Sequence, residues 1–147
     1  MKKLSIFAGS VYGNAQHVAE QVQQALEEKG VEVALFEDPA VDDFSQAEAV
    51  MVITSTTGQG DVPPNLEFFY SELRDQFPLM SGKPFAVAAL GDSSYGDTYC
   101  GGGRQFQELL LELQGQPVVD MLEVDAIETL EPESEVVPWA LAAVEKM

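Results

Sequence analysis

The stretch Ala8-Gly9-Ser10-Val11-Tyr12-Gly13-Asn14-Ala15 is a short polar loop that joins two segments of opposite periodicity. Before it, residues 4–8 have the apolar pattern of a short buried strand, and after it residues 16–29 carry apolar side chains at helical spacing. A strand-to-helix loop of this kind aims free backbone N–H groups and the positive end of a helix dipole at one point. The stretch therefore predicts a phosphate site. A tight turn without a ligand has the same local pattern, so both interpretations stay open at this point.

The segments that follow alternate between strand-like and helix-like patterns. Apolar runs predict further strands at residues 31–36, 49–54, 85–90 and 118–124. Asn65 is expected to cap a helix that runs to about Arg74, further helices are expected over 105–113 and 138–146, and a loop or short helical turn is expected at 38–47. Five strands interleaved with helices predict an α/β fold with an open parallel sheet and helices on both faces. In such sheets, ligands bind beyond the carboxyl ends of the strands.

The composition indicates a globular protein. The chain has 147 residues, of which 46% are hydrophobic, so we expect one domain over residues 1–147. Cys100 is the one cysteine, which excludes an internal disulfide and a tetrahedral cysteine zinc site, and we expect no metal. The first apolar run is too short for a signal peptide, and no stretch is long enough to span a membrane. We therefore expect a cytoplasmic protein without a membrane partner.

The chain is strongly acidic, with a formal net charge of −18 from seven basic and 25 acidic residues. Such a charge repels the phosphates of nucleic acids, so a nucleic-acid partner is not expected. An acidic surface attracts basic proteins and accelerates their association. The same charge also serves solubility, and the charge alone does not separate these two roles.

Three loops that follow predicted strands contain most of the glycine. They span residues 9–15, 55–65 and 91–103. The first is neither a dinucleotide fingerprint nor an NTPase loop, and it has no basic side chain, so backbone N–H groups and the hydroxyls of Ser10 and Tyr12 must hold the phosphate. The second loop is polar although it follows a core strand, and the third places hydroxyls before an aromatic, Tyr95. A ring to stack on and polar groups at the edge are what a flat heterocycle needs.

These three loops closely resemble those of flavodoxins, the FMN-containing electron carriers. The motifs are Ser-x-x-Gly-Asn-Ala at 10–15, Ser-Thr-Thr-Gly-Gln-Gly-Asp at 55–61 and Gly-Asp-Ser-Ser-Tyr at 91–95. The resemblance covers essentially the whole chain, is closest to short-chain bacterial flavodoxins, and extends to the FMN domains of diflavin reductases. It implies a flavodoxin-like three-layer α/β/α fold whose five-stranded parallel sheet has the order 2-1-3-4-5.

The resemblance also implies a function and its partners. The chain is expected to be a monomeric, low-potential one-electron carrier rather than an enzyme. Its partners would be basic-faced redox proteins, such as a flavodoxin or ferredoxin NADP reductase and acceptor enzymes. A low potential is expected because Asp61, Asp92 and Asp97 surround the flavin and the first loop has no basic residue to offset a negative charge.

By the same resemblance, residues 10–15 bind the FMN phosphate and Tyr95 stacks on the outer face of the flavin. Asp92 meets the pyrimidine edge, and Gly58 lies beside flavin N5, where glycine allows a peptide flip at low cost. The complete set of predicted cofactor-binding residues is Ser10, Val11, Tyr12, Gly13, Asn14, Ala15, Ser55, Thr56, Thr57, Gly58, Gly60, Asp61, Gly91, Asp92, Tyr95, Tyr99 and Cys100.

The chain departs from the flavodoxin pattern in four ways, of which the first is Tyr12, at a position where threonine is common. Ala15 stands where a hydroxyl is common, which removes one phosphate donor, and Thr57 stands where many members have an aromatic that covers the inner flavin face. The third loop is one residue longer than usual, so Tyr99 competes with Tyr95 for the stacking position. The intact Gly-Asp-Ser-Ser-Tyr motif favours Tyr95.

Other functions are weighed against these motifs. Cys100 and Arg104 are too close for a phosphatase Cys-x5-Arg loop, so no catalytic residue is assigned. Arg104 is interpreted as a solvated residue at a helix start, and His17 as a surface residue. Two alternatives stay open, namely an FMN-dependent enzyme like the quinone reductases and an accessory protein that holds FMN weakly.

Overall fold

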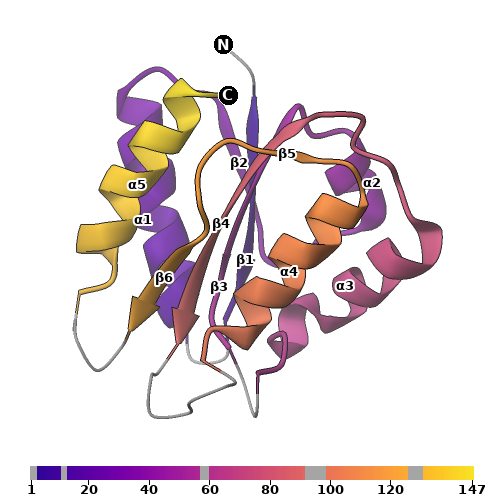
Figure 1. Ribbon diagram of the computed structural model, residues 1–147. Helices are drawn as coiled ribbons and strands as arrows, with labels where there is room; N and C mark the ends of the chain where they lie inside the picture. Colours follow the sequence, from indigo (N-terminus) through magenta and orange to yellow (C-terminus); the bar gives the residue numbers. More distant parts are fainter. Residues whose placement is uncertain (1–2, 11–12, 57–59, 92–98, 126–130) are drawn as a thin grey trace.

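The computed structural model describes residues 3–10, 13–56, 60–91, 99–125 and 131–147. The described strands form one parallel sheet in the order β2-β1-β3-β4-β5, with β6 also beside β4, which confirms the predicted order (Figure 1). The strands are β1 (Leu4–Gly9), β2 (Val33–Phe36), β3 (Ala49–Thr54), β4 (Pro84–Gly91), β5 (Gln116–Pro117) and β6 (Leu122–Asp125). The helices are α1 (Asn14–Glu28), α2 (Val41–Ser45), α3 (Pro64–Gln76), α4 (Gly101–Glu112) and α5 (Glu133–Glu145).

The parallel register brings the ends of the strands together. Gly9 at the end of β1 lies opposite Thr54 at the end of β3, and Gly91 at the end of β4 lies opposite Asp125 in β6. We call this end of the sheet the carboxyl edge. It is the lower end in Figure 1, toward which the strand arrowheads point.

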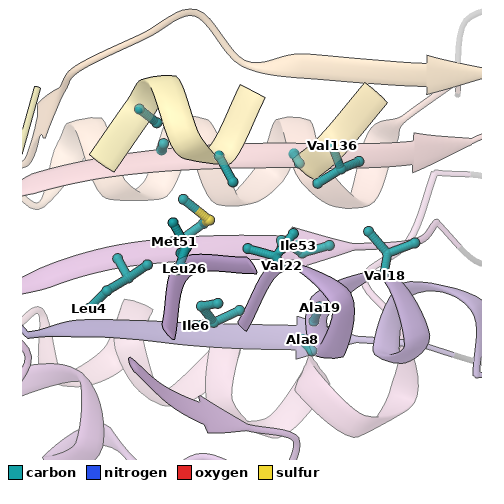
Figure 2. Packing of buried hydrophobic residues seen from close by; sticks show 14 of the residues in the cluster. Leu4, Ile6, Ala8, Val18, Ala19, Val22, Leu26, Met51, Ile53 and Val136 are labelled. Atoms are coloured by element: carbon teal, nitrogen blue, oxygen red, sulfur yellow. The ribbon is translucent and has the colours of Figure 1, made fainter. Parts of the chain in front are cut away.

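One face of the sheet is covered by α1 and α5, as predicted for a three-layer fold. The 3.6-residue period of α1 places Val18, Val22 and Leu26 on one buried stripe. They pack with Ile6 from β1 and with further apolar side chains from β3 and α5 (Figure 2). This packing fixes the position of the α1 N-terminus beside the carboxyl edge.

The opposite face packs against α2, α3 and α4 through a cluster of aromatic rings. The ring of Phe7 stacks between Phe36 and Phe69 at centroid distances of 5.4 and 5.2 Å. Tyr70 meets Phe106 edge to face at 5.2 Å, which joins α3 to α4. Both faces of β1, β3 and β4 are therefore buried, as their near-continuous apolar sequences predicted.

Two predicted elements have different bounds in the structure. Of the strand expected over 118–124, residues 122–124 form part of β6, while residues 118–121 are not in a strand and the Asp120 carbonyl accepts a hydrogen bond from Trp139 Nε1; the short β5 precedes the expected strand. The last helix begins at Glu133 rather than Pro138, which lies inside it. Burial of Val136, Ala140 and Ala143 against the sheet outweighs the hydrogen bond that the proline cannot make.

Two further helices begin earlier than the sequence predicted. Helix α1 starts at Asn14, and α4 starts at Gly101, four residues before the expected start. The glycines at 101–103 had been placed in the third loop, but they form the first turn of α4. None of the described helices has the length and apolar character that crossing a bilayer requires.

Candidate functional site

The first loop offers an anion site at the end of β1. Gly13 precedes α1 with a φ of +87°, a left-handed conformation that suits glycine. His17 N–H makes the first intrahelical bond, to Gly13 O at 2.9 Å, so the amides of Asn14 and Ala15 lie ahead of it, at the positive end of the helix. The first turn of α1 has no acidic residue and no side-chain cap.

Ser10 supplies a hydroxyl at the same place. Its Oγ is buried and has no hydrogen-bond partner in the part of the chain that the structure describes. A buried polar atom without a partner costs about 1–3 kcal/mol, so such an atom at a helix N-terminus indicates a group that binds there. A phosphate fits both features, because it accepts hydrogen bonds from a hydroxyl and from backbone amides.

The second loop lies directly against the first. Ser55 N–H donates to Gly9 O at 2.9 Å, and Ser55 Oγ donates to the same carbonyl at 3.2 Å. A side chain at Gly9 would collide with Thr54 Oγ1 and would lie 2.7 Å from Leu66 Cδ1. The end of β1 can therefore approach the end of β3 and the first turn of α3 this closely because position 9 has no Cβ.

The start of α4 closes onto the second loop. Gly102 N–H donates to Thr56 Oγ1 at 3.1 Å, and Gln105 Nε2 donates to Gly60 O at 2.6 Å. A Cβ on Gly101 would lie 2.6 Å from Gly60 O. The second loop thus occupies the N-terminus of α4.

Cys100 is a structural residue at the end of the third loop. It is fully buried, has a left-handed φ of +57°, and its Sγ donates to Ala89 O at 3.5 Å. Burial raises the pKa of the Cys100 thiol to about 11. A thiol held neutral and turned toward β4 is a poor nucleophile, which agrees with the sequence interpretation.

Tyr99 and Arg104 form a small cluster with Glu123. Arg104 Nε lies 2.9 Å from Glu123 Oε2, and its guanidinium carbon lies 5.8 Å from the centroid of the Tyr99 ring. Burial is the first cause that raises the pKa of Tyr99. Arg104 lies in the first turn of α4 with its side chain 43% exposed, as predicted for a solvated residue at a helix start, and it is also paired with Glu123.

The basic residues are distributed unevenly between the two ends of the sheet. Of the six basic residues in the described part of the chain, Arg104 alone lies near the carboxyl edge. The other five lie at the opposite end of the sheet, before strands or at the ends of helices, namely Lys3, Lys29, Arg74, Lys83 and Lys146. Asp61, Glu67 and Glu133 follow a strand or lie in the first turn of a helix at the carboxyl edge, and Glu123 lies in β6. At this edge the described acidic residues are accompanied by a single described basic residue, whereas the acidic residues at the opposite end, such as Glu28 and Glu48, lie among five basic ones.

Asn65 is a site residue that the sequence interpretation missed. It had been predicted to cap α3, but the helix begins at Pro64, and its cap position, Pro63, makes no side-chain hydrogen bond. Asn65 Oδ1 instead accepts a hydrogen bond from Ser10 N–H at 3.0 Å. The sequence does contain one indication of this role. Proline is favoured at the first position of a helix, so Pro64 could have been predicted to begin α3, which leaves the Asn65 side chain free for a role other than capping.

Eleven of the predicted cofactor residues are described, and they lie at or just beyond the carboxyl ends of β1, β3 and β4. These are Ser10, Gly13, Asn14, Ala15, Ser55, Thr56, Gly60, Asp61, Gly91, Tyr99 and Cys100. His17 is exposed, as predicted. The other predicted residues lie outside the described residues, namely Val11, Tyr12, Thr57, Gly58, Asp92 and Tyr95. Among the described residues, no group of three or more His, Cys, Asp or Glu side chains could hold a metal ion.

Comparison with known proteins identifies the family. Residues 6–139 match the sequence profile of the family described as Flavodoxin. The chain belongs to the flavodoxin family. This result confirms the resemblance found in the three loops, and with it the expected cofactor, FMN, and the coarse role of a flavin electron carrier.

Individual relatives extend over nearly the whole chain. Flavodoxin YqcA of Escherichia coli strain K12 is 42% identical over 141 residues, which cover 95% of this chain and 94% of that protein. The structure of a cysteine-to-serine mutant of flavodoxin from Pseudomonas aeruginosa matches with a TM-score of 0.92 and 43% identity, covering 98% of this chain and 97% of that one. A Fusobacterium nucleatum flavodoxin bound to flavin mononucleotide shares the fold, with a TM-score of 0.84 at 15% identity and coverage of 99% and 98%.

Proposed function

We propose that this flavodoxin holds FMN at the carboxyl edge and carries single electrons at low potential. It would receive them from a basic-faced reductase and pass them to acceptor redox proteins. The observation that carries the proposal is the Ser10 Oγ in the loop before α1, which is buried and has no hydrogen-bond partner among the described residues. When bound, FMN supplies the one-electron redox chemistry, and the residues of the chain bind it and set its surroundings.

The phosphate of FMN is assigned to residues 10–15. The Ser10 hydroxyl and the amides ahead of the first bond in α1 supply donors, and the helix dipole favours the negative charge. Ala15 is fully buried and offers only its backbone N–H. Because the loop has no basic side chain, the affinity for phosphate depends on how well these neutral donors are positioned.

The flavin ring is assigned to the space bordered by the second and third loops. A Cβ on Gly91 would lie 3.2 Å from Tyr99 Cδ1, so the Tyr99 ring packs directly over this glycine. The Arg104 guanidinium also lies over the Tyr99 ring. These contacts support Tyr95 rather than Tyr99 as the residue that stacks on the flavin.

The acidic carboxyl edge supports both the low potential and the type of partner. Additional negative charge on a group bound there is disfavoured, because the one basic side chain near the edge in the described residues, Arg104, is already paired with Glu123. The same edge attracts a partner whose face is basic. Asp61 is exposed at this edge and is assigned to the partner-facing surface.

A titration tests the proposal. The purified protein is reconstituted with FMN and reduced stepwise with dithionite while its visible spectrum is recorded. In a separate assay, oxidation of NADPH is measured with and without an added reductase. We expect two separate one-electron steps, and NADPH oxidation only with the reductase. Turnover of NADPH by the protein alone would favour an FMN-dependent enzyme. A dissociation constant for FMN well above micromolar would favour an accessory role.

A further inference from the structure

We propose that Asn65 is the positioning residue of the phosphate loop, and that the preference of this chain for FMN over unphosphorylated riboflavin depends on it. The inference rests on the proposed function. Asn65 lies on α3, 55 residues from the Ser10 amide that it binds, so it is not part of the phosphate-binding motif itself.

The Asn65 side chain binds three backbone groups at or just beyond the carboxyl ends of β1 and β2. Its Oδ1 accepts the Ser10 N–H at 3.0 Å, and its Nδ2 donates to Ala8 O at 2.9 Å and to Glu37 O at 2.8 Å. A side-chain amide has two N–H donors and one carbonyl, and all three are used here. A flipped amide would place N–H against N–H and carbonyl against carbonyl, so the network also fixes the orientation of the side chain.

This network holds the backbone on both sides of Gly9. Ala8 belongs to β1, whereas Ser10 is the first residue beyond it, and the Asn65 side chain binds both. Gly9 between them is held against Thr54 and Leu66. The direction of the Ser10 side chain, whose Oγ is buried without a partner, is therefore set by Asn65 and by Gly9 together.

The role is separate from the stability of α3. Asn65 follows Pro64, the first residue of the helix, and α3 uses no side-chain cap. Its side chain points away from the helix backbone toward β1 and β2, through bonds that span 57 and 28 residues of sequence. Removal of the side chain therefore acts on the loop more than on the helix that carries it.

The experiment compares Asn65→Ala with wild type and with Gln76→Ala, which removes an exposed amide at the other end of the same helix. Dissociation constants are measured for FMN and for riboflavin. Inorganic phosphate is added to the apoprotein, and the shift in its melting temperature is recorded. The milder Asn65→Ser substitution, which cannot make all three bonds, decides the question if Asn65→Ala does not fold.

For Asn65→Ala we expect the dissociation constant of FMN to rise about 10- to 100-fold. That of riboflavin should rise less than about threefold, and phosphate should no longer stabilise the apoprotein. Gln76→Ala should match wild type in all three measurements. Equal losses for FMN and riboflavin, or an unchanged ratio, would overturn the inference. A wild-type protein that does not bind FMN would overturn the proposed function instead.

Discussion

The amide of Gly102 donates to Thr56 Oγ1 at 3.1 Å, across 46 residues of sequence. This bond joins the loop after β3 to the first turn of α4, and Gly102 itself is buried. The second loop and the start of α4 are thus parts of one hydrogen-bonded unit. The predicted flavin site depends on this unit because it borders the space between the second and third loops.

Thr56→Val should therefore destabilise the protein and loosen the second loop. Valine has nearly the shape of threonine but leaves the buried Gly102 N–H without an acceptor, at a cost of about 1–3 kcal/mol. Urea unfolding of the apoprotein measures the effect. Thr56→Ser, which keeps the oxygen, should retain most of the stability, and a valine variant as stable as wild type would contradict the role assigned to the bond.

Gly103→Ala should destabilise the protein although alanine is the better helix former. A Cβ at this position would collide with the Cβ of Ala89 and lie 3.0 Å from its Cα, so α4 must move away from β4. Overpacking of this kind costs about 1–3 kcal/mol. In the double variant with Ala89→Gly, part of that loss should be recovered, and thermal unfolding of the four proteins of this cycle measures the coupling.

The same glycines show why one boundary could not be predicted from the sequence. Residues 101–103 were assigned to a loop because glycine is a poor helix former. The structure places them in the first turn of α4. They are glycines because that turn packs so closely that Cβ atoms would collide with Gly60, Ser55 and Ala89. Close approach between elements distant in sequence outweighs local propensity, and a single sequence does not reveal that approach.

The sheet was predictable where apolar runs are continuous. The strand at 49–54 matches β3 at both ends, because a strand buried on both faces has a pattern without competing interpretations. The phosphate loop was predictable as a strand-to-helix turn with glycine. Asn65 was not, because its three partners, Ser10, Ala8 and Glu37, become neighbours only in the folded sheet.

Cys100 should make the stability fall at alkaline pH. Its folded pKa of about 11 exceeds the ordinary thiol value of 9.0, so the thiol contributes stability that is complete below pH 9 and lost as the pH rises toward 11. The loss is on the order of 1–2 kcal/mol after allowance for screening. Tyr99, whose pKa is also raised, adds to the loss above pH 10.

Denaturant unfolding between pH 8 and pH 10 isolates the cysteine contribution. Cys100→Ala should flatten the stability curve in this range, whereas a Tyr99→Phe variant should keep the wild-type slope there. The thiol of the folded wild type should also resist iodoacetamide at pH 8. Rapid alkylation of the native protein at that pH would show that the thiol is not held buried and neutral.

Arg104→Gln should strengthen attraction to basic partners with little effect on stability. The Arg104–Glu123 pair is partly exposed, and such pairs contribute about 0–1 kcal/mol. Its removal takes the formal net charge from −18 to −19 and leaves the carboxyl edge more acidic. Association with a basic electron acceptor at low salt should accelerate about two- to fivefold and depend more steeply on ionic strength.

Lys29→Gln is the matched control, because it changes the net charge equally but lies just beyond the end of α1, at the opposite end of the molecule. Stopped-flow electron transfer as a function of salt compares the two variants. Equal acceleration by both would mean that net charge, rather than the carboxyl edge, guides the partner.

Ser10→Ala should change the apoprotein and the FMN complex in opposite directions. In the apoprotein, the substitution removes a buried hydroxyl without a partner, so the free energy of unfolding should stay the same or rise by up to about 1 kcal/mol. In the complex it removes a phosphate donor, so the dissociation constant of FMN should rise about tenfold.

Riboflavin, which lacks the phosphate, should bind the wild type and the Ser10→Ala variant alike. Urea unfolding of the apoprotein and fluorescence titration with the two flavins measure these effects. A variant that loses stability without FMN, or that binds FMN as tightly as wild type, would show that the Ser10 hydroxyl serves the fold rather than the phosphate.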